Sequence, residues 1–257
     1  MAGESGARGE GVPEADVWSR HIRPVRAGGA AEAIARRLGE LIGARMLVAG
    51  DRFPSEKALA EMFGVAPMTV RHSMAVLREE GLVETRRGYR GGTYVVEDVL
   101  SRMKELVALH PYPADQVEEL TAWRQAVSGE ASARAARRAD AEGHRRLREL
   151  AARTHELLPD ADGYRTADAA FHLAIAELSG SRRLWEAEQG IQHELTLLLA
   201  AHPGGAEARS TPGRLHEPLT RAIVAGDAER ARAEFRVHAQ ATLDMCLLFS
   251  RQTPVGE

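Results

Sequence analysis

The chain has a single cysteine, Cys246, among its 257 residues, so a disulfide framework within one chain is excluded. Cys246 lies in an apolar helical run, where we expect a reduced core residue. No stretch of the sequence reaches the length of a membrane span, and residues 1–20 lack the apolar core of a signal peptide. We therefore expect a cytoplasmic protein without a membrane partner.

The chain also lacks a strong excess of charge of either sign. Its formal net charge is -3, which argues against a protein that coats nucleic acid without specificity. Any contact with nucleic acid must then come from a local cationic patch. The length is sufficient for two domains with separate cores.

Residues 55–96 have the pattern of a helix, a tight turn, a second helix and a β-hairpin. Ser55 is a good N-cap for the first helix, and Gly64 ends that helix. Pro67 suits the first position of the second helix, where its missing N–H costs little. The buried faces of the two helices are predicted to contain Leu59, Met62, Phe63, Val70, Met74 and Leu77.

This order of elements is typical of a winged helix-turn-helix domain, which indicates DNA binding. A recognition helix presents its first residues to base edges, and those with outward positions here are Met68, Thr69, Arg71 and His72. The hairpin loop carries the arginines Arg86, Arg87 and Arg90, which suit phosphates or a groove. The alternative is a winged helix that serves protein contacts alone.

Two runs, Leu47-Val48-Ala49-Gly50-Asp51-Arg52-Phe53-Pro54-Ser55-Glu56 and Thr69-Val70-Arg71, resemble the GntR family of bacterial transcription regulators. The family usually has Ser/Thr-Arg just before the second run, where this chain has Ala66 and Pro67. These residues cannot make an arginine's bidentate contact with guanine, so base readout should differ. The resemblance implies contacts with phosphates and bases at Lys57, Thr69, Arg71, Arg87 and Gly88.

The rest of the chain has no strand signal, and its alanine-rich amphipathic stretches predict an all-α bundle. We expect helices over residues 114–138, 140–158, 161–179, 182–202, 213–225 and 227–251. The fold class is thus mainly α, with a winged helix-turn-helix joined to a helical bundle. The expected organisation is a disordered arm (1–25), a DNA-binding domain (26–97), a linker (98–113), an all-α domain (114–251) and a tail (252–257).

Within the bundle, Asp168 and His172 are four residues apart and share one helical face. His216 lies ten residues before Gly226 and His238 twelve residues after it, on either side of an expected antiparallel turn. The two histidines should therefore lie at nearly the same level of adjacent helices. All four side chains can converge if the helix pairs pack together, although histidines of this kind can also be ordinary core residues.

The run Asp168-Ala-Ala-Phe171-His172, with the histidines at 216 and 238, resembles the FCD-type ligand-binding domain of the FadR subfamily. The resemblance implies that Asp168, His172, His216 and His238 hold a divalent metal ion. It also implies that Arg124 faces a small carboxylate effector, while Ser181 replaces an asparagine found in many members. Imidazoles with one carboxylate suit zinc, nickel or manganese.

We therefore expect an effector-responsive regulator, acting as a repressor, that binds a double-stranded DNA operator as a homodimer. Dimerisation is expected because one recognition helix covers only a few base pairs. The alternative is a metal-dependent enzyme that acts on a small organic acid in the bundle. No general acid or base beside the four ligands is evident in the sequence, and a turnover assay would separate the two interpretations.

Overall fold

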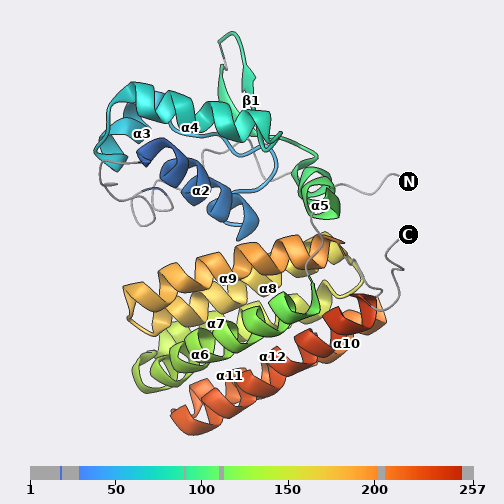
Figure 1. Ribbon diagram of the computed structural model, residues 1–257. Coiled ribbons are helices and arrows are strands. Elements are labelled where there is room, and N and C mark those ends of the chain that lie inside the picture. Colours follow the sequence, from blue (N-terminus) through green and yellow to red (C-terminus); the bar gives the residue numbers. More distant parts are fainter. Residues whose placement is uncertain (1–17, 19–28, 90, 110–112, 202–205, 251–257) are drawn as a thin grey trace, which may run out of the picture. The chain divides into compact units, whose positions relative to one another are not determined.

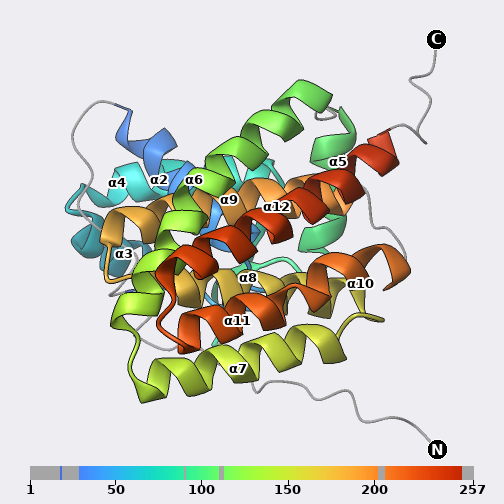
Figure 2. The same ribbon diagram turned by 90° about the horizontal axis from the view of Figure 1, so that it is seen from below.

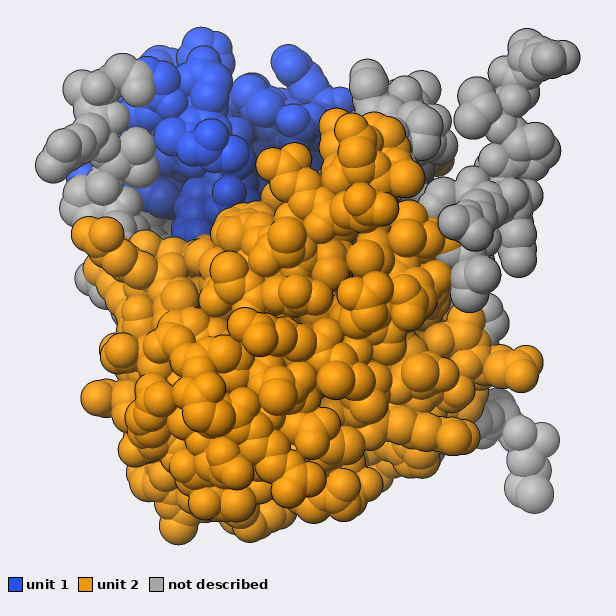
Figure 3. Space-filling model, turned by 60° about the horizontal axis from the view of Figure 1, so that its bottom comes forward, with its two compact units in different colours: residues 1–42, 46–103 blue, residues 43–45, 104–257 orange. Residues whose placement is uncertain are grey.

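The computed structural model describes residue 18 and residues 29–89, 91–109, 113–201 and 206–250 (Figure 1). The chain forms two compact units, shown in different colours in Figure 3. Unit 1 comprises residues 1–42 and 46–103, and unit 2 comprises residues 43–45 and 104–257. Their boundary falls inside helix α5 (Val99–Leu109), within the segment predicted as the linker.

Unit 1 has the predicted order of helices and strands. Ser55 Oγ accepts a hydrogen bond from Ala58 N at 3.2 Å, which caps the first helix of the helix-turn-helix. Gly64 adopts the left-handed conformation, with φ of 69°, that ends this helix. Pro67 then begins the recognition helix, as predicted. The elements are α2 (Ala30–Gly43), α3 (Glu56–Phe63), α4 (Pro67–Glu79), β1 (Val83–Arg86) and β2 (Gly92–Val95).

The strands β1 and β2 form the antiparallel wing, in which Val83 pairs with Val95 and Arg86 with Gly92. The predicted helix faces are buried, apart from Met62, which is half-buried. The expected N-terminal arm lies outside the described residues except for Trp18. This residue is buried, and its ring centroid lies 5.5 Å from that of Phe53.

Unit 2 is an all-α bundle, and Figure 2 shows α11 between α7 and α12. The predicted helix from 213 to 225 is wrong in detail, because a break at Leu215 separates two shorter helices. The first of these, α10, contains Pro212, which lies outside the expected helices. The Pro212 carbonyl oxygen lies 3.2 Å from His238 Nδ1, so tertiary contact offsets the weak helix propensity there. The helices are α6 (Ala114–Arg138), α7 (Ala141–Glu156), α8 (Ala161–Leu178), α9 (Arg182–Ala201), α10 (Ala206–Arg214), α11 (His216–Val224) and α12 (Ala228–Ser250).

Small side chains on α6 allow α12 to pack closely against it. Ala131 and Ala135 on α6 share one apolar cluster with Ala231 and Phe235 on α12. A second cluster includes Val117 near the start of α6 and residues near the end of α12. Along α6, the buried polar residues Thr121, Arg124 and Ser128 fall between these two clusters. No helix among the described residues is long and apolar enough to cross a membrane.

Candidate functional site

The predicted DNA-reading residues of α3 and α4 lie on the surface of unit 1. Lys57, Arg71 and His72 are exposed, and Met68 is 64% exposed. Thr69 is half-buried. Arg71 Nε lies 3.1 Å from Glu56 Oε2, and this ion pair links the recognition helix to α3. The Arg71 side chain is exposed. An exposed ion pair of this kind is weak, so the guanidinium remains accessible to another partner.

The arginines of the wing differ in their surroundings. Arg86 Nε lies 2.7 Å from Glu84 Oε1, and Nη2 lies 3.3 Å from Glu97 Oε1. Its guanidinium also lies over the Tyr94 ring, 4.5 Å from the centroid. Arg87 is exposed and forms no ion pair within the described part of the chain, so its charge is the more available to a phosphate. Gly88 has φ of 103°, and Arg90 lies outside the described residues.

Sequence reasoning missed the exposed aromatic ring of the wing. Tyr89 is fully exposed, between Gly88 and the second strand. Exposed apolar or aromatic groups on the recognition helix and wing are available for contact with DNA. The signal was present in the sequence, since Tyr89 interrupts a run of glycine and arginine.

The structure brings Asp168, His172, His216 and His238 together in the interior of unit 2. All four are buried, and one ligand atom from each lies within 4.8 Å of the others. The two from α8 are one turn apart, as predicted from their spacing. The hairpin of α11 and α12 brings the ring centroids of His216 and His238 to 4.7 Å, which confirms the predicted level of these residues. The turn contains Gly226 with φ of 74°.

The protonation of two histidines follows from their neighbours. Pro212 O accepts a hydrogen bond, so the nitrogen 3.2 Å away, His238 Nδ1, carries the hydrogen. Thr154 Oγ1 donates to Ala151 O at 2.8 Å and therefore accepts from His216 Nδ1 at 3.0 Å. When these imidazoles are neutral, the lone pair of each lies on Nε2.

This assignment leaves the Nε2 lone pair of His216 facing a carboxylate. His216 Nε2 lies 3.0 Å from Asp168 Oδ1, and His172 Nε2 lies 3.7 Å from the same oxygen. A lone pair and a carboxylate at this distance repel each other unless a proton or a cation lies between them. Hydrogen bonds from the outer ring nitrogen to a carbonyl or hydroxyl are also typical of metal-binding histidines. The residues therefore fit a divalent metal ion.

The pKa values agree with this donor set. Burial lowers the pKa of His172 to about 4. Burial and the neighbouring imidazoles hold the pKa of His238 well below its ordinary value. For Asp168, burial opposes ionisation, but the Arg165 guanidinium and the neighbouring His172 imidazole hold its pKa well below the usual range. An ionised carboxylate and neutral imidazoles are the forms that bind metal.

Arg124 lies beside this cluster. Its side chain is buried, and Nη2 lies 3.0 Å from His238 Nε2 and 3.5 Å from His172 Nε2. Burial lowers its pKa from the ordinary value. Among the described residues, Arg124 Nε has no hydrogen-bond partner. A buried donor of this kind is costly unless another acceptor reaches it.

A second buried arginine, Arg165, was not predicted. It donates to Asp168 Oδ2 from Nη1, to Gln192 Oε1 from Nη2 and to Thr196 Oγ1 from Nε at 3.1 Å. Arg165 therefore positions the Asp168 carboxylate. The sequence contains a signal for this role, because Arg165 lies three residues before Asp168 on the same helix face. Thr154 had no such signal, because its contact with His216 depends on the packing of α7 against α11.

Comparison with known proteins adds independent findings for both units. Residues 30–95 match the model of bacterial regulatory proteins, gntR family, and residues 119–241 match the FCD domain. The chain is 36% identical over 208 residues to RmpR of Mycobacterium gastri, described as an HTH-type transcriptional regulator, covering 79% of this chain and 74% of the relative. It is 29% identical over 222 residues to an Escherichia coli K12 protein described as an L-lactate dehydrogenase operon regulatory protein, covering 80% of this chain and 82% of that protein.

Among solved structures, Escherichia coli McbR/YncC matches with a TM-score of 0.52 at 18% identity, covering 87% of this chain and 98% of that chain. This likeness concerns the fold alone. The described fold, a winged helix-turn-helix with an all-α second unit, agrees with it.

Proposed function

The chain belongs to the GntR family of bacterial transcriptional regulators, with an FCD domain after the DNA-binding domain, and from this premise we propose that its bundle is a metal-assisted sensor of a small carboxylate. The chain is a DNA-binding transcriptional regulator rather than an enzyme.

One observation carries the metal part of the proposal. Buried side chains from three helices, α8, α11 and α12, direct ligand atoms toward one place, with Nε2 lone pairs assigned at His216 and His238. We propose that these two residues, Asp168 and His172 hold a zinc, nickel or manganese ion. When bound, such an ion supplies a Lewis-acidic position for a carboxylate oxygen.

Arg124 supports the effector part of the proposal. Its guanidinium lies against two of the four ligands, and its Nε–H lacks a partner among the described residues. A carboxylate between the metal position and Arg124 would accept charge-assisted hydrogen bonds there. The name of the Escherichia coli relative refers to the operon of an L-lactate enzyme, and lactate is a small carboxylate of this kind.

For DNA binding, we propose contacts at the exposed residues of α3, α4 and the wing. Each chain has a single recognition helix in unit 1, so a homodimer would supply the second helix that reads the second half-site. We further propose that the protein is a repressor and that the effector shifts the population between DNA-binding and released states. The proposed contacts are Lys57, Met68, Thr69, Arg71, His72, Arg86, Arg87, Gly88 and Arg90.

The metal part can be tested by comparing the wild type with His216→Ala. We expect dialysed wild type to retain stoichiometric metal in elemental analysis and His216→Ala to retain none. A chelator should lower the melting temperature of the wild type, because loss of a ligand held a hundredfold above its Kd costs about 2.7 kcal/mol. The matched control is His155→Ala, which removes an exposed histidine of α7.

The control should keep both the metal and the sensitivity to chelator. A wild type that contains no metal and still responds to a small carboxylate on operator DNA would contradict the metal part. Arg124 would then be the centre of the sensor without an ion.

A further inference from the structure

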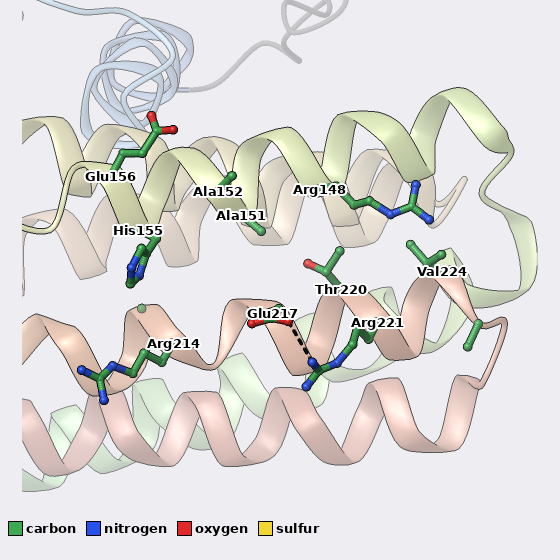
Figure 4. A pocket seen from close by; sticks show the side chains of 12 residues that line it. Arg148, Ala151, Ala152, His155, Glu156, Arg214, Glu217, Thr220, Arg221 and Val224 are labelled. Atoms are coloured by element: carbon green, nitrogen blue, oxygen red, sulfur yellow. Dashed lines mark hydrogen bonds and ion pairs between the residues drawn. The ribbon is translucent and has the colours of Figure 1, made fainter.

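The outer surfaces of α7 and α11 form a groove with a volume of about 970 Å³, which Figure 4 shows from close by. On α7, Arg148, Ala151, Ala152 and His155 are spaced to share one helical face. The small side chains of Ala151 and Ala152 leave the middle of the groove open and apolar. The lining residues are Arg148, Ala151, Ala152, His155, Glu156, Gly213, Arg214, Glu217, Thr220, Arg221, Val224 and Ala225.

Charge is distributed unevenly along this groove. Glu217 Oε1 accepts from Arg221 Nη1 at 2.8 Å, and Glu156 Oε2 accepts from Arg153 Nη1 at 3.2 Å, so both lining carboxylates are neutralised. Arg148 and Arg214 are exposed and have no ion-pair partner among the described residues. The groove therefore has an excess of positive charge from these two residues.

The two unpaired arginines lie at opposite ends. Figure 4 shows Arg148 at the end marked by Val224, and Arg214 at the end marked by His155. On α7, Arg148 and His155 are seven residues apart, which corresponds to about 10 Å along the helix. The groove thus presents a cation, an apolar stretch and a second cation in that order.

We propose that this groove binds an elongated organic dianion, with an anionic group at each arginine and an apolar body over Ala151 and Ala152. Its size is in the range of pockets that enclose drug-sized molecules, well above the need of a small acid such as lactate. The groove is therefore a second ligand site, separate from the buried cluster around Asp168.

The hydrogen bonds behind the groove connect it with that cluster. Ala151, in the lining, accepts the hydrogen of Thr154, which in turn accepts from His216. Thr220, also in the lining, donates to His216 O at 2.8 Å. A ligand that ties α7 to α11 would hold Thr154 against the His216 ring. This coupling rests on the proposed metal site, whereas the groove itself does not.

Binding can be measured with bis-ANS, a dye that carries two sulfonates on an apolar body, and with dodecanedioate as its competitor. We expect the wild type to bind the dye at one site per chain and dodecanedioate to displace it, while succinate, which is too short, does not. Arg148→Ala combined with Arg214→Ala should raise the Kd of dodecanedioate tenfold or more. Ala152→Trp should block the groove to the same extent.

The matched control is Arg145→Ala combined with Arg230→Ala, which removes two exposed arginines outside the lining. Its Kd should stay within twofold of the wild type. Equal affinity for dodecanedioate in all variants would overturn the proposal. The proposal is also overturned if the groove variants change in oligomeric state and neither bis-ANS nor dodecanedioate binds, because a second copy of the chain would then be the occupant of the groove.

Coupling is measured separately, by titrating nickel into the protein with and without saturating dodecanedioate. The ligand should lower the Kd for nickel threefold or more in the wild type and leave it unchanged in Thr154→Val. If nickel fails to bind at all, the metal site is wrong while the dye experiment still decides the groove. If nickel binds with the same Kd in both conditions, the coupling is wrong.

Discussion

The DNA-reading segment of unit 1 and the ligand cluster of unit 2 both depend on charged or polar side chains, but only the second buries them. The Arg71 side chain is 64% exposed near the start of the recognition helix, whereas Asp168 is 5% exposed and His238 is 1% exposed. Exposed charges contribute little to folding. Buried charges must be compensated, so substitutions in the cluster should change both binding and folding.

The contrast also separates what each unit can do. A surface that reads DNA can change its residues freely, because its core of α2, α3 and α4 lies elsewhere. A buried sensor is part of the bundle interior, so ligand binding there acts on helix packing directly. The bundle's stability should therefore respond to ions and pH in ways that unit 1 does not.

The strongest test of this contrast is Asp168→Ala, measured in the presence of a chelator. The substitution leaves the Arg165 guanidinium buried without its carboxylate. Removing one partner of a buried ion pair costs roughly 3 to 5 kcal/mol. Urea unfolding followed by circular dichroism should show a loss of this size. Asp244→Ala, which removes an exposed acid of α12, should change stability by less than about 0.5 kcal/mol. Equal effects of the two substitutions would show that Asp168 is not a compensated charge.

The two units also differ in how far the sequence could predict them. In unit 1 the signals are local: Ser55, Gly64 and Pro67 end or begin helices by their own chemistry. In unit 2 the spacing of Asp168 and His172 and the hairpin at Gly226 indicated that four side chains could converge if the helix pairs pack together.

The remaining details of unit 2 depend on contacts between distant segments. Residues 206–212 of helix α10 were not expected to be helical, because a proline such as Pro212 is unfavourable inside a helix. The contact of Thr154 with His216 requires α7 to pack on α11, which no local pattern encodes. Local spacing therefore indicated that the four side chains could converge, the family resemblance implied their role as metal ligands, and tertiary packing supplied the residues that orient them.

The pH dependence of the metal-free bundle gives the second test. The folded protein holds the pKa of His172 at about 4, below its ordinary value of 6.5. The native state then binds fewer protons than the unfolded state between these values, so stability falls as the pH drops from 6.5 to 4. This shift corresponds to a loss on the order of 3 kcal/mol.

His172→Gln should make the pH profile less steep in this range, because it removes one of the imidazoles whose pKa is lowered in the folded protein, while His238 remains. The matched substitution His155→Gln, on the surface of α7, should leave the profile as in the wild type. A wild-type profile that is flat from pH 6.5 to 4 would mean that the imidazole of His172 titrates as it does in water.

The third test compares neighbouring arginines of the wing. Arg87 has no ion-pair partner among the described residues, whereas Arg86 contacts Glu84 and Glu97. We expect Arg87→Ala to weaken operator binding by roughly 1.5 to 3 kcal/mol, the contribution of a hydrogen bond to a charged group. The slope of log K against log salt should decrease in magnitude by about one unit. Arg86→Ala should change the slope less, because its charge is already shared. Gel shifts across a salt series measure both the operator affinity and the slope. A larger effect of Arg86→Ala than of Arg87→Ala would contradict the view that Arg87 is the arginine more available to a phosphate.

The smallest predicted effect concerns a single methyl group. Met68 exposes its apolar side chain next to Pro67, which has no donor for a base edge. An apolar side chain in the major groove can recognise thymine through its methyl group. Replacing the contacted thymine by uracil removes that methyl, at a cost of about 0.8 kcal/mol or roughly fourfold in Kd.

The control for this effect is the same substitution outside the protected half-site, which should leave the Kd unchanged. Met68→Ala should bind the thymine and uracil operators equally, because the side chain that senses the methyl is absent. Wild-type protein that tolerates uracil at every position of the half-site would exclude methyl readout by Met68. Since the side chain is exposed, loss of its contact should leave the unfolding of unit 1 unchanged, in contrast to the substitutions in the buried cluster.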